Sequence, residues 1–273
     1  MMARTLLTFD VIERVRLGAE LVAADAIARE TSTMRVPPIV PEPETQRRFL
    51  LSHALLLTRS MAKGAYAAAD EAARELGCVD MIELFHARDR GDGRRARLVL
   101  HGEPIGIELA GDSLAVHDHA ELVAIFGHEI GHCLAHTAHP QLARVVAAVS
   151  GASPKSRRIW SLASELTADR LGLLACRDLD AVLRLEMRGA MGHVPSLFLD
   201  TSAYLDQCRV LGEELVARSR PMFGQTHPEH YVRGWAASLF YESDVYHSLT
   251  GSGPGCRSLA SVDATLNVVL GTR

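Results

Sequence analysis

Apolar side chains recur at helical spacing in two long stretches near the start of the chain. In residues 10–33 they return every three or four positions, which predicts an amphipathic helix. The same spacing over residues 45–76 predicts a second helix, which ends before Gly77, a typical helix-stopping residue. Residues 36–44 contain four prolines and predict an extended connector between the two helices.

Strand-like patterns replace this spacing in the middle of the chain. Residues 79–87, 95–102 and 104–116 are short apolar segments separated by turn-forming residues, and they predict three strands. Helical spacing then resumes towards the end of the chain. Further helices are predicted over residues 119–138, 154–176, 179–191, 196–219 and 227–243.

Two of these helices carry clear start signals. Asp118 and Glu121 have the spacing of a capping box, in which each side chain accepts a hydrogen bond from the backbone N–H of the other residue. Ser153 followed by Pro154 is a typical helix start. Both signals place the helices that follow in a defined register.

Length and composition allow one large domain. The 273 residues are 48% hydrophobic, which is enough to bury a full core. Helical blocks on either side of a small sheet predict a helix-rich α+β fold. We expect a single domain over residues 1–273, with 1–44 as N-terminal helix and connector and 45–273 as the catalytic core.

Charge and targeting signals narrow the classes of function. The net charge of −4 gives no general attraction to nucleic acid or anionic lipid, so neither is expected as a partner. No charge-free apolar run reaches the roughly 18–20 residues that a membrane-spanning helix needs. The N-terminus lacks the apolar core and cleavage site of a signal peptide, which predicts a cytoplasmic location. The five scattered cysteines argue against a disulfide framework and a cysteine zinc site.

The segment HEIGH, at residues 128–132, points most clearly to chemistry. His128 and His132 are four residues apart on a predicted helix, so each can offer a ring nitrogen to one zinc ion. Glu129 is rotated to one side, where it can take a proton from water on the metal. The pattern also arises by chance, and a histidine pair can be an ordinary polar helix face. A catalytic zinc site therefore needs a third ligand from elsewhere in the chain.

Two acids on the next predicted helix can complete such a site. Glu165 and Asp169 are four residues apart and share a helix face. One can ligate the metal while the other accepts the free N–H of a ligand histidine. Alone they would be ordinary surface acids. Beside HExxH, with Ala168 and Gly172 allowing close helix packing, the ligand role is favoured.

Other histidines compete for the third position. The pattern HExxHxxGxxH fails because Ala135 and Ala138 stand where it requires glycine and histidine. His136, one turn further along the helix, is the best rival, although three successive turns of a straight helix converge poorly on one ion. His117 and His119 lie at the helix entry and are expected to be local polar residues.

Together these motifs resemble the HtpX and CAAX-prenyl-endopeptidase family of gluzincin zinc metallopeptidases. That family carries HExxH followed by ExxAD, as in residues 128–132 and 161–169. Residues 168–185 resemble its ADRLG helix, and residues 226–238 resemble its THP…R segment. The resemblance covers about 120–240 and implies a gluzincin-type fold with a zinc cofactor. Only 32 residues lie between His132 and Glu165, with no spanning helix among them, so we expect a soluble, compact relative rather than a membrane member.

The resemblance also implies a role for each residue that matches a family motif. The zinc ligands would be His128, His132 and Glu165, with Glu129 as general base, Asp169 supporting a ligand, and His227 and Arg233 stabilising the oxyanion.

The placement of the oxyanion residues stays open at this point. Thr226 and Glu229 have capping-box spacing, which would put His227 in the first turn of a helix. His230 lies three residues before Arg233, shares its helix face better and is the rival donor. Either histidine must act as a cation or a strong hydrogen-bond donor near the scissile carbonyl.

The chain departs from the family at two places. Leu162 stands where the family often has arginine, and residues 102–116 replace its usual Asn-Ala-Phe stretch. We expect the latter segment to be an edge strand that pairs with an extended peptide substrate through backbone hydrogen bonds. Its altered sequence leaves the substrate preference open. The sequence does not indicate the oligomeric state.

The expected function is peptide-bond hydrolysis by a zinc-bound water that Glu129 activates, on a peptide or protein bound as an extended strand. Two alternatives remain. The site can hydrolyse a small-molecule amide or ester, because HExxH does not choose the substrate. The chain can also be a non-catalytic interaction protein with structural zinc, although such a site needs no base. A removable fourth ligand, His136 or His230, would instead make the site latent.

Overall fold

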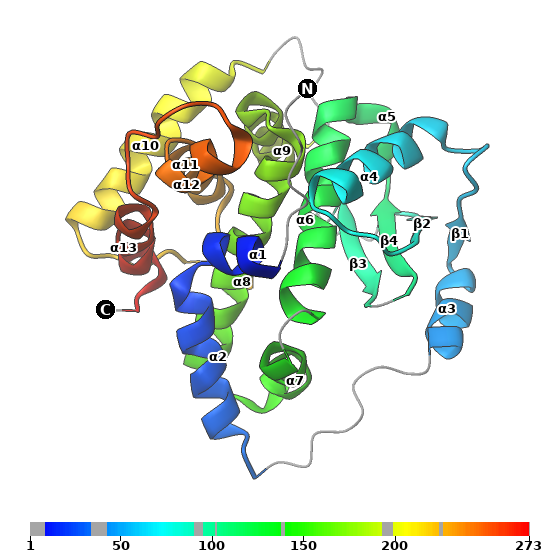
Figure 1. Ribbon diagram of the computed structural model, residues 1–273, viewed down its shortest axis with the longest axis horizontal. Helices are drawn as coiled ribbons and strands as arrows, with labels where there is room; N and C mark the ends of the chain where they lie inside the picture. Colours follow the sequence, from blue (N-terminus) through cyan, green and yellow to red (C-terminus); the bar gives the residue numbers. More distant parts are fainter. Residues whose placement is uncertain are drawn as a thin grey trace.

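Helices α6 (His119–Thr137) and α8 (Pro154–Cys176) pack against each other through the middle of the molecule (Figure 1). Glycines permit this close approach. A Cβ on Gly127 would lie 2.5 Å from a side chain of α8, and a Cβ on Gly172 would lie 2.8 Å from the carbonyl oxygen of Ala124. A larger residue at either position would push the helices apart. The structure, a computed structural model, describes residues 9–33, 43–89, 95–101, 103–137, 140–192, 199–223 and 226–272.

A four-stranded sheet lies beside these helices. Its strands are, in spatial order, β1 (Ala54–Leu56), β2 (Ile82–Ala87), β4 (Ile105–Ala110) and β3 (Ala96–Leu100). β2 and β4 run parallel, and each outer strand pairs antiparallel with its neighbour. β3 is therefore an edge strand, and it contacts α6 (Figure 1).

The prediction that residues 102–116 form the edge strand is wrong. β4, within this segment, lies between β2 and β3 and is buried along its whole length. The segment then ends in the short helix α5 (Ser113–Val116) instead of continuing as strand. Strand order depends on long-range packing, which the local apolar pattern does not encode.

The single helix predicted over residues 45–76 is also wrong. That region contains α3 (Pro43–Leu51), strand β1 and α4 (Lys63–Glu75). A short apolar run does not distinguish helix from strand, and here pairing of β1 with β2 decides the outcome. The predicted stop is confirmed, since α4 ends just before Gly77, which has a positive φ of 64°.

The N-terminal helical stretch is divided into α1 (Phe9–Val15) and α2 (Gly18–Glu30), with an extended Leu17 between them. α2 packs along α8 (Figure 1). The proline-rich connector predicted over 36–44 lies outside the described residues as far as position 42.

The helices predicted after the sheet are found, and the described part of the chain contains further helices. α9 (Leu179–Met191) matches its prediction, and α10 (Thr201–Ala217) and α11 (His230–Tyr241) are shorter than predicted. Besides α5, the helices that were not predicted are α7 (Pro140–Ala148), α12 (Asp244–Thr250) and α13 (Leu259–Leu270).

The α+β class with many helices and a small sheet is confirmed. The largest apolar core lies between the sheet, α4, α6, α8 and α9, and a second core lies under α10, α11 and α13. In the described part of the chain, no helix is both long and apolar enough to cross a membrane.

Candidate metal centre

The two central helices start where their capping signals predict. Asp118 Oδ1 accepts a hydrogen bond from the Glu121 backbone N at 2.9 Å, and Glu121 Oε2 accepts one from the Asp118 backbone N at 3.1 Å. At the start of α8, Ser153 Oγ accepts from the Ser156 backbone N at 3.2 Å. Because these caps determine the residue at which each helix begins, they help to determine which polar side chains of the two helices face each other.

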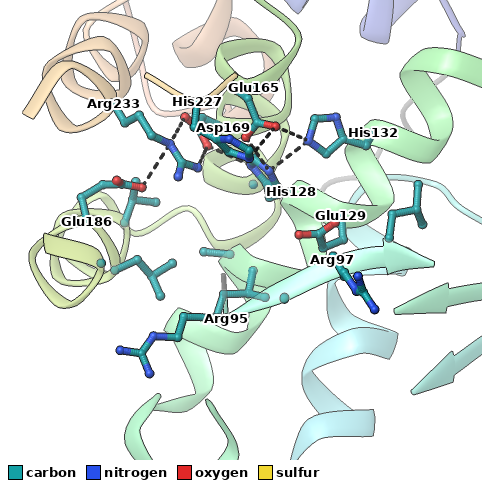
Figure 2. Close-up of a pocket in the computed structure, with 18 of the residues that line it drawn as sticks. Arg95, Arg97, His128, Glu129, His132, Glu165, Asp169, Glu186, His227 and Arg233 are labelled. Carbon is teal, nitrogen blue, oxygen red and sulfur yellow. Dashed lines mark hydrogen bonds and ion pairs between the residues drawn. The ribbon is translucent and has the colours of Figure 1, made fainter. Parts of the chain in front are cut away.

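His128 and His132 of α6 and Glu165 of α8 converge on one point (Figure 2). The two histidine Nε2 atoms are 3.1 Å apart. Glu165 places Oε2 3.5 Å from His128 Nε2 and Oε1 3.5 Å from His132 Nε2. The three residues that the sequence predicts as metal ligands therefore lie together in the structure, although they come from two helices.

The spacing of these atoms fits a single zinc ion. A tetrahedral zinc with ligand atoms at ~2.0–2.1 Å separates those atoms by roughly 3.3–3.4 Å. The observed separations of 3.1, 3.5 and 3.5 Å bracket that value. Two imidazole nitrogens and one carboxylate form a typical donor set for a catalytic zinc, which keeps its fourth position open.

Asp169, one turn beyond Glu165, holds the first histidine from behind. His128 Nδ1 lies 2.9 Å from Asp169 Oδ1, so Nδ1–H donates to the carboxylate and Nε2 is left for a cation. Arg233 Nε in turn donates to Asp169 Oδ2 at 2.9 Å. The role that the resemblance implied for Asp169 is compatible with this geometry.

Burial and charge act together on the ionisable groups. Burial opposes the charge of His128, but hydrogen bonds with Asp169 and Glu165 outweigh it and raise the pKa of the imidazole to about 10. Burial also opposes ionisation of Asp169, yet Arg233 and His128 lower the pKa of its carboxyl to about 2. The pKa of Glu165 is held well below its usual range, against burial, by His128 and His132. Both carboxylates are therefore ionised at neutral pH.

Glu129 lies beside the cluster but takes no part in it. Its side chain is mostly buried and lines the same cleft as His128, His132 and Glu165. Figure 2 places Glu129 between the His128–His132 pair and strand β3. This position suits a group that exchanges protons with a molecule in the cleft.

The cleft in front of the cluster has a volume of about 540 Å³. Its walls come from strand β3, helices α6, α8 and α9, and the segment from His227 to Arg233. Leu98, Ile125, Val182 and Leu185 make part of the lining apolar. A cleft of this size can hold several residues of an extended peptide or a small molecule.

His227 is the downstream histidine that reaches the cluster. Its Nε2 lies 3.5 Å from Glu165 Oε1, while its Nδ1 lies 2.9 Å from Thr226 Oγ1. The capping box predicted for Thr226 and Glu229 is wrong, because α11 begins only at His230 and Glu229 Oε1 accepts from the Phe223 backbone N at 2.6 Å. His227 therefore precedes the helix and does not lie in its first turn.

His230 and Arg233 are held by a residue that the sequence argument missed. Glu186 of α9 is buried, and its Oε2 lies 2.8 Å from His230 Nδ1 and its Oε1 3.4 Å from Arg233 Nε. The His230 ring packs so closely on Gly189 that a Cβ there would lie 2.3 Å from it. The signal was available, since Glu186 is an acid on the apolar face of an amphipathic helix.

The other histidines that the sequence argument weighed, His117, His119 and His136, lie outside the cluster of His128, His132 and Glu165. His117 Nδ1 pairs with Glu121 Oε2 at 3.1 Å, and His117 lines the cleft. His119 is exposed and pairs with Glu71 at 2.9 Å. His136 is buried behind the cluster, where its Nε2 lies 3.1 Å from Ser164 Oγ.

No protein-family profile, no curated protein and no solved structure matches this chain. Its function must therefore be argued from the geometry of the site.

Proposed function

We propose that this chain is a zinc-dependent metallopeptidase of gluzincin type, similar to the HtpX and CAAX-prenyl-endopeptidase family. The observation that carries the proposal is the convergence of His128, His132 and Glu165, whose donor atoms lie 3.1–3.5 Å apart beside a cleft. Two histidines and a glutamate form a set found in catalytic zinc sites of peptidases. Glu129, which lies beside this cluster, is the proposed general base.

The chemistry divides between the cation and the chain. A bound Zn²⁺ supplies polarisation of the substrate carbonyl and a lowered pKa for water. Glu129 takes the proton of the attacking water and delivers it to the leaving amine. His227, on the side of Glu165, donates a hydrogen bond to the carbonyl oxygen as negative charge develops on it. Arg233 acts by holding Asp169, which in turn orients His128.

The strand proposed to bind substrate is β3, in place of residues 102–116. In the described part of the chain β3 pairs with β4 alone, and residues 96–98 line the cleft. The free backbone edge of β3 can pair with an extended peptide, while Leu98 and Ile125 contact its side chains. The proposed substrate is therefore a peptide or protein segment in extended conformation.

The test is Glu129→Gln, assayed with a broad peptide library after metal analysis. The variant should keep zinc, because Glu129 is not a ligand, and should lose turnover by roughly 1,000-fold or more, because both proton transfers depend on it. Cleavage at the wild-type rate would remove Glu129 from the mechanism. Wild-type protein that binds zinc, cleaves no peptide, and hydrolyses small amides or esters through Glu129 would support a small-molecule hydrolase instead.

A further inference from the structure

Behind the ligand cluster, a chain of buried polar contacts reaches the second ligand histidine. Ser164, next to Glu165 on α8, places Oγ 3.5 Å from His132 Nδ1 and 3.1 Å from His136 Nε2. Ser164 and His136 are both less than a tenth exposed. The His136 ring packs against the Trp160 ring with centroids 5.4 Å apart, which fixes its orientation.

The N-terminal helix α2 supplies the next member of this chain. Glu20 is fully buried, and its Oε1 lies 3.7 Å from His136 Nε2. Its Oε2 accepts a hydrogen bond from Thr167 Oγ1 at 2.7 Å, and its Oε1 accepts one from Arg16 Nη1 at 3.1 Å. Arg16 also donates to the carbonyl oxygen of Ala135 on α6 at 2.9 Å. Glu20 therefore ties α2 to both central helices.

The two ligand histidines are supported in different ways. His128 donates its Nδ1–H to the ionised Asp169, a strong charge-assisted hydrogen bond. A histidine that offers Nε2 to a cation carries its proton on Nδ1, so His132 must find its acceptor elsewhere. Ser164 Oγ is the acceptor within reach of His132 Nδ1, and His136 lies against the other side of that hydroxyl.

We propose that Ser164, His136 and Glu20 are positioning residues for His132, so that the N-terminal helix α2 is part of the support of the metal site. The inference rests on the zinc site proposed above. It also changes the part assigned to His136, which orients a ligand and is not itself one. If the contacts of Glu20, His136 and Ser164 served only to hold α2 against the core, they would not need to extend as far as His132.

Zinc affinity measured by competition with a chromogenic chelator tests this, on protein whose fold is checked by circular dichroism and urea unfolding. Ser164→Ala removes the acceptor and should weaken Zn²⁺ binding roughly 10- to 100-fold, the range for such supporting residues. Glu20→Gln should weaken it by roughly 3- to 10-fold, because Glu20 acts through two intermediates. If Glu20→Gln fails to fold, Ser164→Ala decides the question.

Glu30→Gln is the matched control. Glu30 anchors the other end of α2 to the start of α8, through hydrogen bonds from the Ser153 backbone N and the Ser156 Oγ, both 2.7 Å long. Glu30 makes no contact with the His132 network among those described, so its variant should bind zinc within about twofold of wild type.

The outcomes separate the two proposals. Wild-type zinc affinity in Ser164→Ala overturns the positioning inference and leaves the zinc site standing. Equal weakening by Glu30→Gln and Glu20→Gln also overturns it, because a general loosening of α2 would then explain the loss. A wild-type protein that binds no zinc overturns the zinc site and the positioning inference together.

Discussion

Helix α6 carries two buried polar clusters, one at its start and one in its middle, and the two clusters use their polar atoms differently. Near its start, Glu121 is fully buried and its carboxylate receives hydrogen bonds from Arg184 Nε at 2.9 Å and from the backbone N of Asp118 at 3.1 Å, with His117 Nδ1 also 3.1 Å away. Arg188 lies 3.4 Å from the same carboxylate. Each oxygen of Glu121 already has partners.

In the middle of the helix, the polar atoms of the second cluster face one another across a space that lies beside the cleft. His128 Nε2, His132 Nε2 and the Glu165 carboxylate oxygens surround one small space beside the cleft, with separations of 3.1–3.5 Å. Buried charge alone is therefore a weak sign of function, since the first cluster is compensated within the fold. Two imidazole nitrogens and a carboxylate that converge next to a cleft are the more informative feature.

The largest expected effect concerns the cluster around Glu121, which we call the closed cluster because both carboxylate oxygens have partners. Glu121→Gln removes the buried negative charge that faces Arg184 and Arg188 and should lower the free energy of unfolding of the metal-free protein by about 3–5 kcal/mol. Zinc affinity of the folded variant should stay within a few-fold of wild type, because Glu121 does not contact the ligands. Urea unfolding and metal titration measure the two quantities. A large loss of zinc affinity in the folded variant would mean that the two clusters are energetically coupled and do not act separately.

Glu165→Gln is the corresponding change in the cluster of His128, His132 and Glu165, which we call the open cluster because it borders the cleft. An apparent zinc binding free energy of about 10–16 kcal/mol, shared over four positions, assigns about 3–4 kcal/mol to each ligand. Zinc affinity should therefore fall by roughly 100- to 1,000-fold. Chelator competition measures it. Unchanged affinity would mean that Glu165 is not a ligand.

A pH dependence sharpens the contrast. Burial opposes ionisation of Glu121, but His117 and Arg184 outweigh it and lower the pKa of its carboxyl from 4.5 to about 2. A lowered pKa in the folded state adds stability that is complete above pH 4.5 and is lost as the pH falls towards 2. Between these values, unfolding free energy should fall by about 2–3 kcal/mol more in wild type than in Glu121→Gln. Parallel pH profiles of the two metal-free proteins would contradict this role.

The smallest expected effect concerns the helix contact that holds the open cluster together. A Cβ on Gly172 would lie 2.8 Å from the Ala124 carbonyl oxygen and 3.5 Å from His128 Cβ. Gly172→Ala should therefore destabilise the protein by about 1–2 kcal/mol and weaken zinc binding by several-fold, since it shifts α8 relative to α6. Gly64→Ala, where a Cβ would meet nothing within 4 Å, is the control. Equal effects of the two variants would exclude close packing as the reason for glycine at 172.

The sequence could predict the parts of the site that depend on local spacing. Residues four apart on a helix share a face whatever the fold, so His128 with His132, and Glu165 with Asp169, were identifiable from the chain. The capping residues Asp118 and Glu121 likewise act within one turn. These predictions needed no knowledge of tertiary structure.

The parts that failed depend on distant packing. The edge position of β3 follows from the order of strands in the sheet, which no local pattern specifies. Glu229 has capping-box spacing from Thr226 but is used by the backbone of Phe223, so the helix starts later than predicted. The contact of Glu20 with the central helices joins segments far apart in the sequence, and nothing near Glu20 indicates it.

The most direct measurement is a crystal structure of the protein with zinc, using anomalous scattering at the zinc edge to locate the ion. We expect one ion ~2.0–2.1 Å from His128 Nε2, His132 Nε2 and a Glu165 oxygen, with its fourth position facing the cleft and free of protein side chains. An ion bound elsewhere, or none at this place, would contradict the account, as would a fourth protein ligand closing the site.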